Sequence, residues 1–407
     1  MGIVRDKVLA FGYHVYGNTK RRGGFPAILE QIASFGYFVD YFTTPMSYGW
    51  LYKNTDRENI RNFFKLIVGT EFNIGHGKII NRGLLNLLPW KISRFIFSKK
   101  FLCFAPTLDQ VVRVAKQKVY DLVVLESVPA ALYGPVIKEN TRTPLIYRAS
   151  DPLIAWFSTY FSDTDKMEKD LFQVSDEVWV PNEICYRYYI EHGFPKNKMV
   201  IIKNPLLTVS QLENIENNTK LSNEGNELRR SILQGKYRKI GLYFGAVEID
   251  YRLIDIIAKK VKDVVFVIIG PYRKKMDMAH NVVFLGPLDN TKIDQFVQIS
   301  DFGFLPYKKV GDMDVLRTAP TGKVVRFLLH LKPVFQFSQY DISFPYIYSV
   351  KVESEFVEKI QEVHREAEKM KEDKNLLRLK EFLKDYTVEN FIQNVRLRLS
   401  NYIKVPK

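Results

Sequence analysis

Short apolar runs alternate with amphipathic stretches along the first half of the chain. The run KVLAFGY precedes the helix-like stretch FPAILEQIASFG, and the runs YFVDYFTT, YDLVVLES, PLIYRAS, EVWVPN and MVIIKN follow. Apolar runs separated by helical patterns are typical of parallel βαβ units in a doubly wound sheet. We therefore expect an α/β, Rossmann-like domain over residues 1–205.

The same alternation resumes after a polar, Asn-rich passage, NIENNTKLSNEGNELRR. We interpret residues 205–237 as the connection between two domains, with an irregular or helical segment inside it. The later strand candidates are KIGLYFGAVE, VVFVIIGPY, NVVFLGPL, DFGFLPY and KPVFQF. They predict a second Rossmann-like domain over 206–380, facing the first across a cleft. The final segment, 381–407, is expected to be a helix that packs back toward the first domain.

The composition is that of a globular protein with a negatively charged partner. The chain has 407 residues, 46% of them hydrophobic, and a formal net charge of +15. Nucleic acid, an anionic membrane and a phosphorylated substrate are the partners that such a charge favours. We expect no nucleic acid partner, because the chain has no zinc-finger spacing, no RNP-like aromatic motif and no concentrated basic tail.

A basic, aromatic region lies between Leu51 and Ala105. It contains ten Lys or Arg against three Asp or Glu, and its densest part reads LLPWKISRFIFSKKFLCF. This mixture suits a surface that lies in a lipid headgroup layer, but it also suits a core-facing helix with a solvated basic face. No apolar run approaches the roughly 20 residues needed to span a bilayer. We expect a cytoplasmic protein attached peripherally to the inner face of the plasma membrane, since the N-terminus also lacks a signal-peptide pattern.

The segment YRASDP places polar side chains where a buried strand should end. In open α/β sheets ligands gather beyond the carboxyl ends of the strands, so Asp151 is a candidate catalytic group there. Pro152 suits the first turn of a helix, so Asp151 is equally a candidate N-cap. Arg148, in the same segment, is a candidate acceptor contact, and Glu126 at the end of YDLVVLES either touches an acceptor or caps the next helix.

The segment TGKVVR predicts a phosphate-binding helix start in the second half. Lys323 and Arg326 share one helix face near a positively polarised end, directly after Thr321 and Gly322, and such a combination can hold a diphosphate. The segment lacks the P-loop pattern, so it does not predict ATP hydrolysis. Tyr307 ends the preceding strand candidate and opens a long polar loop that leads to this helix.

Two glycines follow successive strand candidates of the second half. Gly245 in FGAVE and Gly270 in IGPYR, with Tyr272 beside it, permit close backbone approach to a phosphate or a sugar, although glycine after a strand is usually a turn residue. In the first half, the loop YHVYGNTKRRGGF is basic and precedes a helix. It either embraces an acceptor phosphate or forms a solvated turn. Its candidate acceptor residues are His14, Arg21, Arg22, Gly23 and Gly24.

Two aspartate pairs raise the question of a metal ion. Asp312 and Asp314 form one pair, and Asp163 and Asp165 form the other. Paired aspartates are common in polar segments, so we expect no metal site and no cofactor beyond a donor substrate. Lys323 and a helix dipole would then stabilise the leaving phosphate.

Taken in order, several of these segments resemble one family. The segments GGF, LVVLES, LIYRASD and the region from LPY to TGKVVRFLLHLKPVF resemble GT-B glycosyltransferases of the GumK type, named after the membrane-associated glucuronosyltransferase of xanthan synthesis. The resemblance covers nearly the whole chain. It implies a GT-B fold and transfer from a UDP-sugar, first of all UDP-glucuronate, to a polyprenyl-diphosphate-linked oligosaccharide in exopolysaccharide or capsule synthesis.

The resemblance also assigns roles to residues. Asp151 corresponds to the inverting catalytic base, Tyr307 to a nucleotide contact and Lys323 to the residue that grips the diphosphate. The chain departs from the family at three donor positions: Arg326 stands for a glutamine, Pro287 for a glutamate and Val247 for a methionine. Retaining members commonly carry a Glu-x7-Glu pair where this chain has no Glu, which favours inversion. A different UDP-sugar donor, an epimerase of the same fold and a noncatalytic binder of sugar nucleotides are the alternatives.

Overall fold

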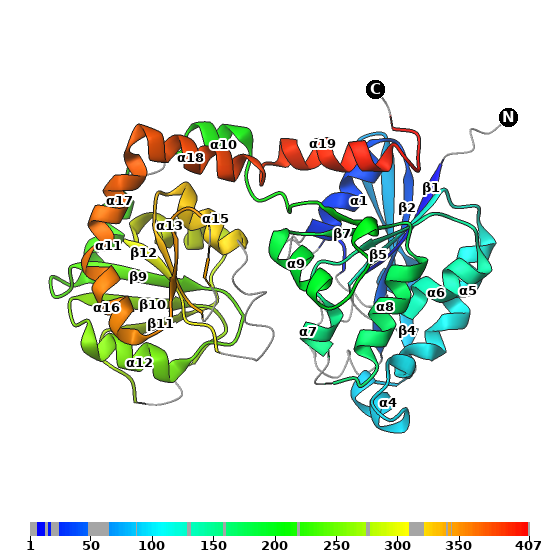
Figure 1. Cartoon of the computed structure of the whole chain (residues 1–407), viewed down its shortest axis with the longest axis horizontal. Coiled ribbons are helices and arrows are strands. Elements are labelled where there is room, and N and C mark those ends of the chain that lie inside the picture. Colours follow the sequence, from blue (N-terminus) through cyan, green and yellow to red (C-terminus); the bar gives the residue numbers. More distant parts are fainter. Residues whose placement is uncertain are drawn as a thin grey trace. The chain divides into compact units, whose positions relative to one another are not determined.

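A computed structural model gives the arrangement of the chain in two compact units, one of residues Met1–Pro205 with Asn390–Lys407 and one of Leu206–Glu389 (Figure 1). Each unit contains its own β-sheet and the helices that pack on it. The structure describes residues 6–12, 15–17, 24–47, 65–86, 88–127, 132–157, 160–217, 220–273, 277–308, 321–338, 341–342 and 344–405.

The first unit is built on an eight-stranded sheet. Every neighbouring pair of strands is parallel except β3 with β4, which is antiparallel. The central strands are almost continuous apolar runs because helices cover a parallel sheet on both faces. In sheet order the strands are β3 (Thr70–Ile74), β4 (Gly77–Asn86), β2 (Phe38–Ser47), β1 (Lys7–Gly12), β5 (Leu122–Glu126), β6 (Leu145–Arg148), β7 (Glu177–Val180) and β8 (Met199–Ile201).

The helices of the first unit include one from the end of the chain. Phe391, Val395 and Leu399 of α19 belong to the same buried cluster as residues of β1 and α1. The chain returns to the first unit at Asn390, whereas α18 still belongs to the second unit. The helices are α1 (Gly24–Ser34), α4 (Trp90–Ile96), α5 (Leu108–Gln117), α6 (Tyr133–Asn140), α7 (Leu153–Phe157), α8 (Thr164–Val174), α9 (Glu183–Glu191) and α19 (Val388–Leu399), with 3-10 turns at Phe101–Thr107 and Lys196–Lys198.

The second unit has a six-stranded, wholly parallel sheet. Its order is β11 (Val282–Gly286), β10 (Val264–Ile269), β9 (Lys239–Phe244), β12 (Phe302–Leu305), β13 (Val334–Phe337) and β14 (Ile347–Val350). Its helices are α10 (Val209–Glu213), α11 (Asn223–Leu233), α12 (Tyr251–Lys260), α13 (Asn290–Ile299), α15 (Gly322–Leu329), α16 (Glu353–Gln361), α17 (Val363–Lys371) and α18 (Asp373–Lys384). Both units therefore have the expected Rossmann-like architecture.

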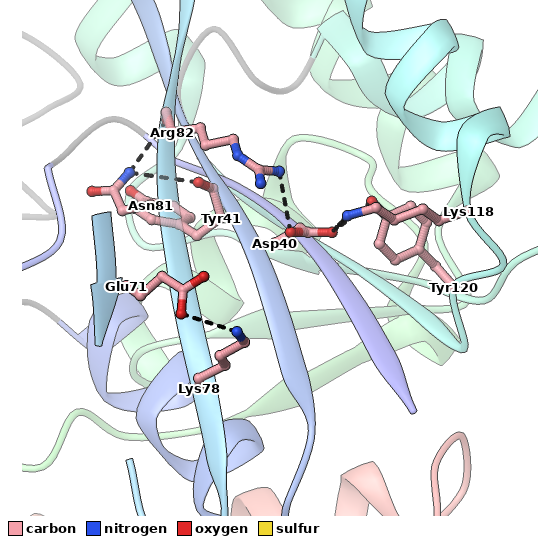
Figure 2. Close-up of polar contacts among 8 residues, drawn as sticks. All are labelled: Asp40, Tyr41, Glu71, Lys78, Asn81, Arg82, Lys118 and Tyr120. Atoms are coloured by element: carbon pink, nitrogen blue, oxygen red, sulfur yellow. Dashed lines mark hydrogen bonds and ion pairs between the residues drawn. The ribbon is translucent and has the colours of Figure 1, made fainter. Parts of the chain in front are cut away.

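A buried carboxylate joins the beginnings of the strands in the first unit (Figure 2). Asp40 of β2 is almost fully buried, and its carboxylate lies 3.4 Å from Arg82 Nη1 and 2.6 Å from Lys118 Nζ. Tyr120 donates its hydroxyl to the same carboxylate at 2.9 Å. We call this group the Asp40 cluster. Asp40 lies near the start of β2, and Lys118 and Tyr120 precede β5, so the cluster holds the amino-terminal edge of the sheet.

The basic, aromatic segment divides between core and surface. Phe101 and Phe104 are buried, so part of this segment packs into the core, as the interpretation of a core-facing segment expects. Ile92, Phe95 and Ile96 of α4 are exposed to solvent beside Lys99 and Lys100. No helix among the described residues is both long and apolar enough to cross a bilayer.

Candidate active site

Three parallel strands of the first unit end side by side at one edge of the sheet. Phe11 of β1 pairs with Leu125 of β5, and Glu126 of β5 pairs with Arg148 of β6. The carboxyl ends of these strands therefore meet at one edge, which is the edge where ligands bind in such sheets. Asp151 follows β6 at this edge.

Asp151 is an exposed residue on this edge. The residue is exposed, and its backbone N–H donates to Ser127 Oγ at 3.1 Å. Ser127 directly follows β5, and its own N–H donates to the carbonyl of Arg148 at 3.0 Å. The turn after β5 thus fixes the backbone that carries Asp151. Ser127 was not among the residues predicted from the sequence.

The helix after Asp151 is held by a different carboxylate. Helix α7 begins at Leu153, so Pro152 precedes its first turn instead of opening it. The N–H of Leu153 donates to Glu168 Oε2 at 2.9 Å. Glu168 thus makes to the start of α7 the kind of bond that an N-cap makes. Whether Asp151 also caps this helix stays a prediction.

Glu126 meets a tyrosine that sequence analysis did not identify. An ideal Cβ placed on Gly12 would lie 2.7 Å from Tyr41 Oη and 2.8 Å from Glu126 Oε2, so both groups converge over this glycine. Burial, and next the charge of Glu126, raise the pKa of Tyr41 well above its usual range. Tyr41 therefore keeps its proton. Nothing in the pattern around Tyr41, an aromatic residue within a strand, distinguishes it from a core residue.

Arg148 and Gly24 meet in the interior of the first unit. The Arg148 side chain is fully buried, donating to the carbonyl of Ile202 at 2.8 Å and to Asn204 Oδ1 at 2.6 Å. Burial lowers its pKa to about 10. An ideal Cβ on Gly24 would lie 1.8 Å from Asn204 Oδ1, so a larger residue there would displace the amide that Arg148 bonds. This arrangement gives Arg148 a structural role and does not support the expected acceptor contact.

Several expected site residues lie outside the described part of the chain. These are His14, Arg21, Arg22 and Gly23, together with Asp312 and Asp314. Their roles stay predictions. Of the other aspartate pair, Asp163 accepts the N–H of Phe101 at 3.0 Å and Asp165 pairs with Lys169 at 2.8 Å.

Lys323 stands between two tyrosine rings in the second unit. It is the second residue of α15, and its Nζ lies 4.9 Å from the ring centroid of Tyr243 and 5.0 Å from that of Tyr307. Nζ also donates to Tyr307 Oη at 3.1 Å. The rings restrict the ammonium to the start of α15, where the helix dipole favours an anion. Sequence analysis identified Lys323 and Tyr307 but not Tyr243.

One of the two expected glycines lies against this lysine, and the other lies against the first glycine. Gly245 and Gly270 have φ values of +151° and +148°, which favour glycine. A Cβ on Gly245 would lie 2.7 Å from Lys323 Nζ, and a Cβ on Gly270 would lie 2.0 Å from the carbonyl oxygen of Gly245. Tyr272 donates to the carbonyl of Val247 at 2.7 Å. Burial, as the first cause, raises the pKa of Tyr272 to about 12.

The remaining donor candidates border the same edge. Arg326 lies 3.3 Å from Asp294 and donates to Asn290 at 3.2 Å, so α13 neutralises part of its charge. Pro287 is exposed directly after β11. Thr321 holds the N-cap position of α15 without a side-chain capping bond, and Gly322 begins the helix. A cavity of about 250 Å³ adjoins Tyr307, lined also by Asp250, Arg252, Phe337, Ser338 and Lys351 among others.

Comparisons with known proteins agree with this architecture. Residues 11–181 match the model of the family described as glucuronosyltransferase GumK, N-terminal domain. HepE from Anabaena in complex with UDP-glucose is 16% identical with a TM-score of 0.62, over 97% of this chain and 99% of that one. The fold is GT-B.

Other GT-B structures match over similar lengths. Sucrose-phosphate synthase from Thermosynechococcus elongatus is 12% identical with a TM-score of 0.62, over 98% of this chain and 99% of that one. The UDP-forming α,α-trehalose-phosphate synthase from Burkholderia vietnamiensis is 10% identical with a TM-score of 0.61, over 98% and 100%. No curated protein sequence matches this chain. At these identities the solved structures establish the fold, and the family model connects the first domain with GumK.

Proposed function

We propose that this protein is an inverting glycosyltransferase that moves a sugar from a UDP-sugar to a lipid-linked oligosaccharide. The observation that carries the proposal is the exposed residue Asp151 at the carboxyl edge of a domain that matches the model of the GumK N-terminal domain. The second domain supplies a cation, Lys323, at a helix start. These two groups correspond to the two requirements of the reaction, a base and a group that stabilises the leaving diphosphate.

In the proposed reaction, the Asp151 carboxylate takes the proton of an acceptor hydroxyl. The acceptor oxygen attacks the anomeric carbon from the face opposite the diphosphate. The bond between that carbon and the phosphate oxygen breaks, and its electron pair leaves with UDP, so the new glycosidic bond has the inverted configuration. Lys323 and the N–H groups at the start of α15 stabilise the charge that develops on the leaving phosphate.

UDP-glucuronate is the first donor to test, because the family model that matches belongs to a glucuronosyltransferase. UDP-glucose is the second, because the HepE structure contains it. The acceptor that we propose is a polyprenyl-diphosphate-linked oligosaccharide. The exposed apolar side chains of α4, next to Lys99 and Lys100, would attach the first domain to the anionic membrane in which that acceptor lies.

The test replaces Asp151 by Asn, which keeps the shape of the side chain and removes its basicity. Transfer of radiolabelled sugar to membrane-extracted lipid-linked oligosaccharides should fall by about 10²- to 10⁴-fold, while thermal stabilisation by the UDP-sugar should remain. Asp165→Asn is the matched control, because Asp165 forms only a half-exposed pair with Lys169 on the surface of the same domain. Wild-type transfer by Asp151→Asn would exclude Asp151 as the base.

A further inference from the structure

Glu168 of α8 is the most completely enclosed carboxylate near the candidate site. Its side chain is 0% exposed. Oε1 accepts the hydroxyls of Tyr147 at 2.8 Å and Tyr189 at 2.7 Å. Oε2 accepts the N–H of Leu153 at 2.9 Å, and the N–H of Ile154 also bonds to this carboxylate. Every one of these partners is a donor, and together they come from β6, α7 and α9.

The two amides are the first two of α7, the helix that follows Asp151 and Pro152. Short helices leave their first N–H groups without partners inside the helix, and a carboxylate that accepts them fixes both the start and the direction of the helix. Glu168 does this from α8, 15 positions further along the chain. It therefore determines where the chain that carries Asp151 enters α7.

We propose that Glu168 is a positioning residue for the candidate base: by bonding the first amides of α7, it holds the Asp151 carboxylate in the place where it meets the acceptor hydroxyl. This inference rests on the proposed function, in which Asp151 is the base. Glu168 itself touches no substrate, since it is fully enclosed. Because a displacement of about 1 Å can lower a rate by about 10²-fold, such a support affects turnover more than binding.

The charge of Glu168 matters to this role. An ionised carboxylate only accepts hydrogen bonds, which suits the four donors around Glu168. A protonated carboxyl group carries an O–H, which points its hydrogen at one of these donors. At least one donor must then turn away, and the remaining bonds lose their charge assistance. Burial raises the pKa of Glu168 to about 7, while the bonds from Tyr189, Tyr147, Leu153 and Ile154 act in the opposite direction.

Among the described residues, the titratable groups next to Glu168 are tyrosines, a thiol and a carboxylate, and no ion pair joins it to a cation. Tyr147 of β6 and Tyr189 of α9 donate to it, and burial raises both pKa values well above their usual range, so both keep their protons. The thiol of Cys185 in α9, whose pKa is raised by burial first, and the carboxylate of Asp151 complete the group. Arg148 bonds elsewhere, to Ile202 and Asn204. Loss of activity between pH 8 and about 6 would accordingly report on Glu168.

The first test is Glu168→Gln in the full-length protein. The amide keeps the volume but cannot accept from both sides, since its nitrogen is a donor. Transfer should fall by about 10- to 100-fold in kcat, with the affinity for UDP unchanged. Hydrogen exchange of the amides of residues 153–157 should become faster. Asp40→Asn is the matched control, because the Asp40 cluster is an equally buried carboxylate site at the opposite edge of the same sheet (Figure 2).

The second test is Tyr189→Phe, which removes one donor and preserves the volume. Because that bond lowers the pKa of Glu168, its loss should move the acid limb of the kcat profile to higher pH while the alkaline plateau stays near the wild-type value. This variant also serves if Glu168→Gln fails to fold. A merely structural role predicts lower thermal stability with an unchanged pH profile.

The outcomes separate this inference from the proposed function. In one outcome, Asp151→Asn abolishes transfer, Glu168→Gln retains the wild-type kcat and Tyr189→Phe leaves the pH profile of kcat unchanged. The positioning role of Glu168 is then wrong, whereas the assignment of Asp151 as the base still holds. If Asp151→Asn transfers normally, the proposed function fails first. Slow exchange at residues 153–157 in folded Glu168→Gln would also overturn the role, whatever the activity.

Discussion

The affinity for UDP should depend on the single ammonium group of Lys323. Lys323→Met keeps most of the apolar stem between the rings of Tyr243 and Tyr307 and removes the charge. The Nζ atom sits at the start of α15, 3.1 Å from Tyr307 Oη, and a Cβ on Gly245 would come within 2.7 Å of it. In the proposed function the ammonium of Lys323 contacts the diphosphate of UDP.

The size of the effect follows from the kind of bond that is lost. A hydrogen bond to a charged group contributes about 1.5 to 3 kcal/mol, and each 1.4 kcal/mol is a factor of ten in affinity, so the Kd for UDP should rise by about 10- to 100-fold. The N–H groups of α15 remain in the variant, so binding should persist. The dependence of the Kd on salt should become weaker, because one cation facing the phosphates is gone.

Isothermal titration with UDP and with uridine separates charge from packing. Uridine carries no phosphate, so its affinity should be the same for Lys323→Met and the wild type. The control variant is Lys259→Met, whose lysine is 64% exposed and pairs with Asp255 at 2.7 Å near the end of α12. If UDP and uridine weaken equally, or if UDP binds Lys323→Met as tightly as the wild type, the assignment of Lys323 to the diphosphate is refuted.

Three further predictions concern the membrane, the donor edge and pH. Phe95 is 70% exposed on α4, so Phe95→Ser should weaken binding to phosphatidylglycerol vesicles by about 10-fold in co-sedimentation, whereas Leu377→Ser, at 60% exposure in the second unit, should not. Gly270→Ala should lower the free energy of unfolding by about 1 to 3 kcal/mol in urea titration, because φ is +148° and the new Cβ meets the Gly245 carbonyl; an unchanged midpoint would contradict this. The pKa of Glu168 is raised when folded, so its stabilising contribution is complete below its unfolded pKa and is lost as pH rises through about 7. The free energy of unfolding of Glu168→Gln minus that of the wild type should therefore increase by about 2 kcal/mol from pH 5 to pH 8. If the two free energies change with pH in parallel, this prediction is refuted.

Most strands could be predicted from the sequence because buried parallel strands are continuous apolar runs. The run VVFVII forms β10, and all six residues are buried. Strands β3 and β4 were not predicted. Their burial alternates between buried or half-buried and more exposed positions, and they lie in a region that the charge pattern marked as a membrane surface. The short β14 also lacked a distinctive run.

The positions of the candidate residues could be predicted where they lie near the end of an element. Asp151 lies three residues after β6 and Lys323 lies in the first turn of α15, and such positions can be located from local pattern. Asn204 and Tyr243 could not be found in this way, because their roles come from contacts with residues far along the chain. Asn204, for example, meets Arg148 across 56 positions. The same contact explains why Arg148 was misjudged, since its segment gave no sign that Asn204 would receive its guanidinium.

Glu168 and Asp151 both lie close to the carboxyl end of β6, and their different surroundings suit them to different roles in the proposed function. Glu168 is enclosed, bonded by four donors and has its pKa raised to about 7, so it can neither reach an acceptor nor stay fully ionised at neutral pH. Asp151 is exposed at the carboxyl edge of the sheet, the edge where ligands bind in open α/β sheets. Glu168 bonds the first two amides of α7 and so fixes the backbone that follows Asp151. In the proposed function, an exposed aspartate on a backbone that a buried glutamate fixes is an arrangement suited to proton transfer.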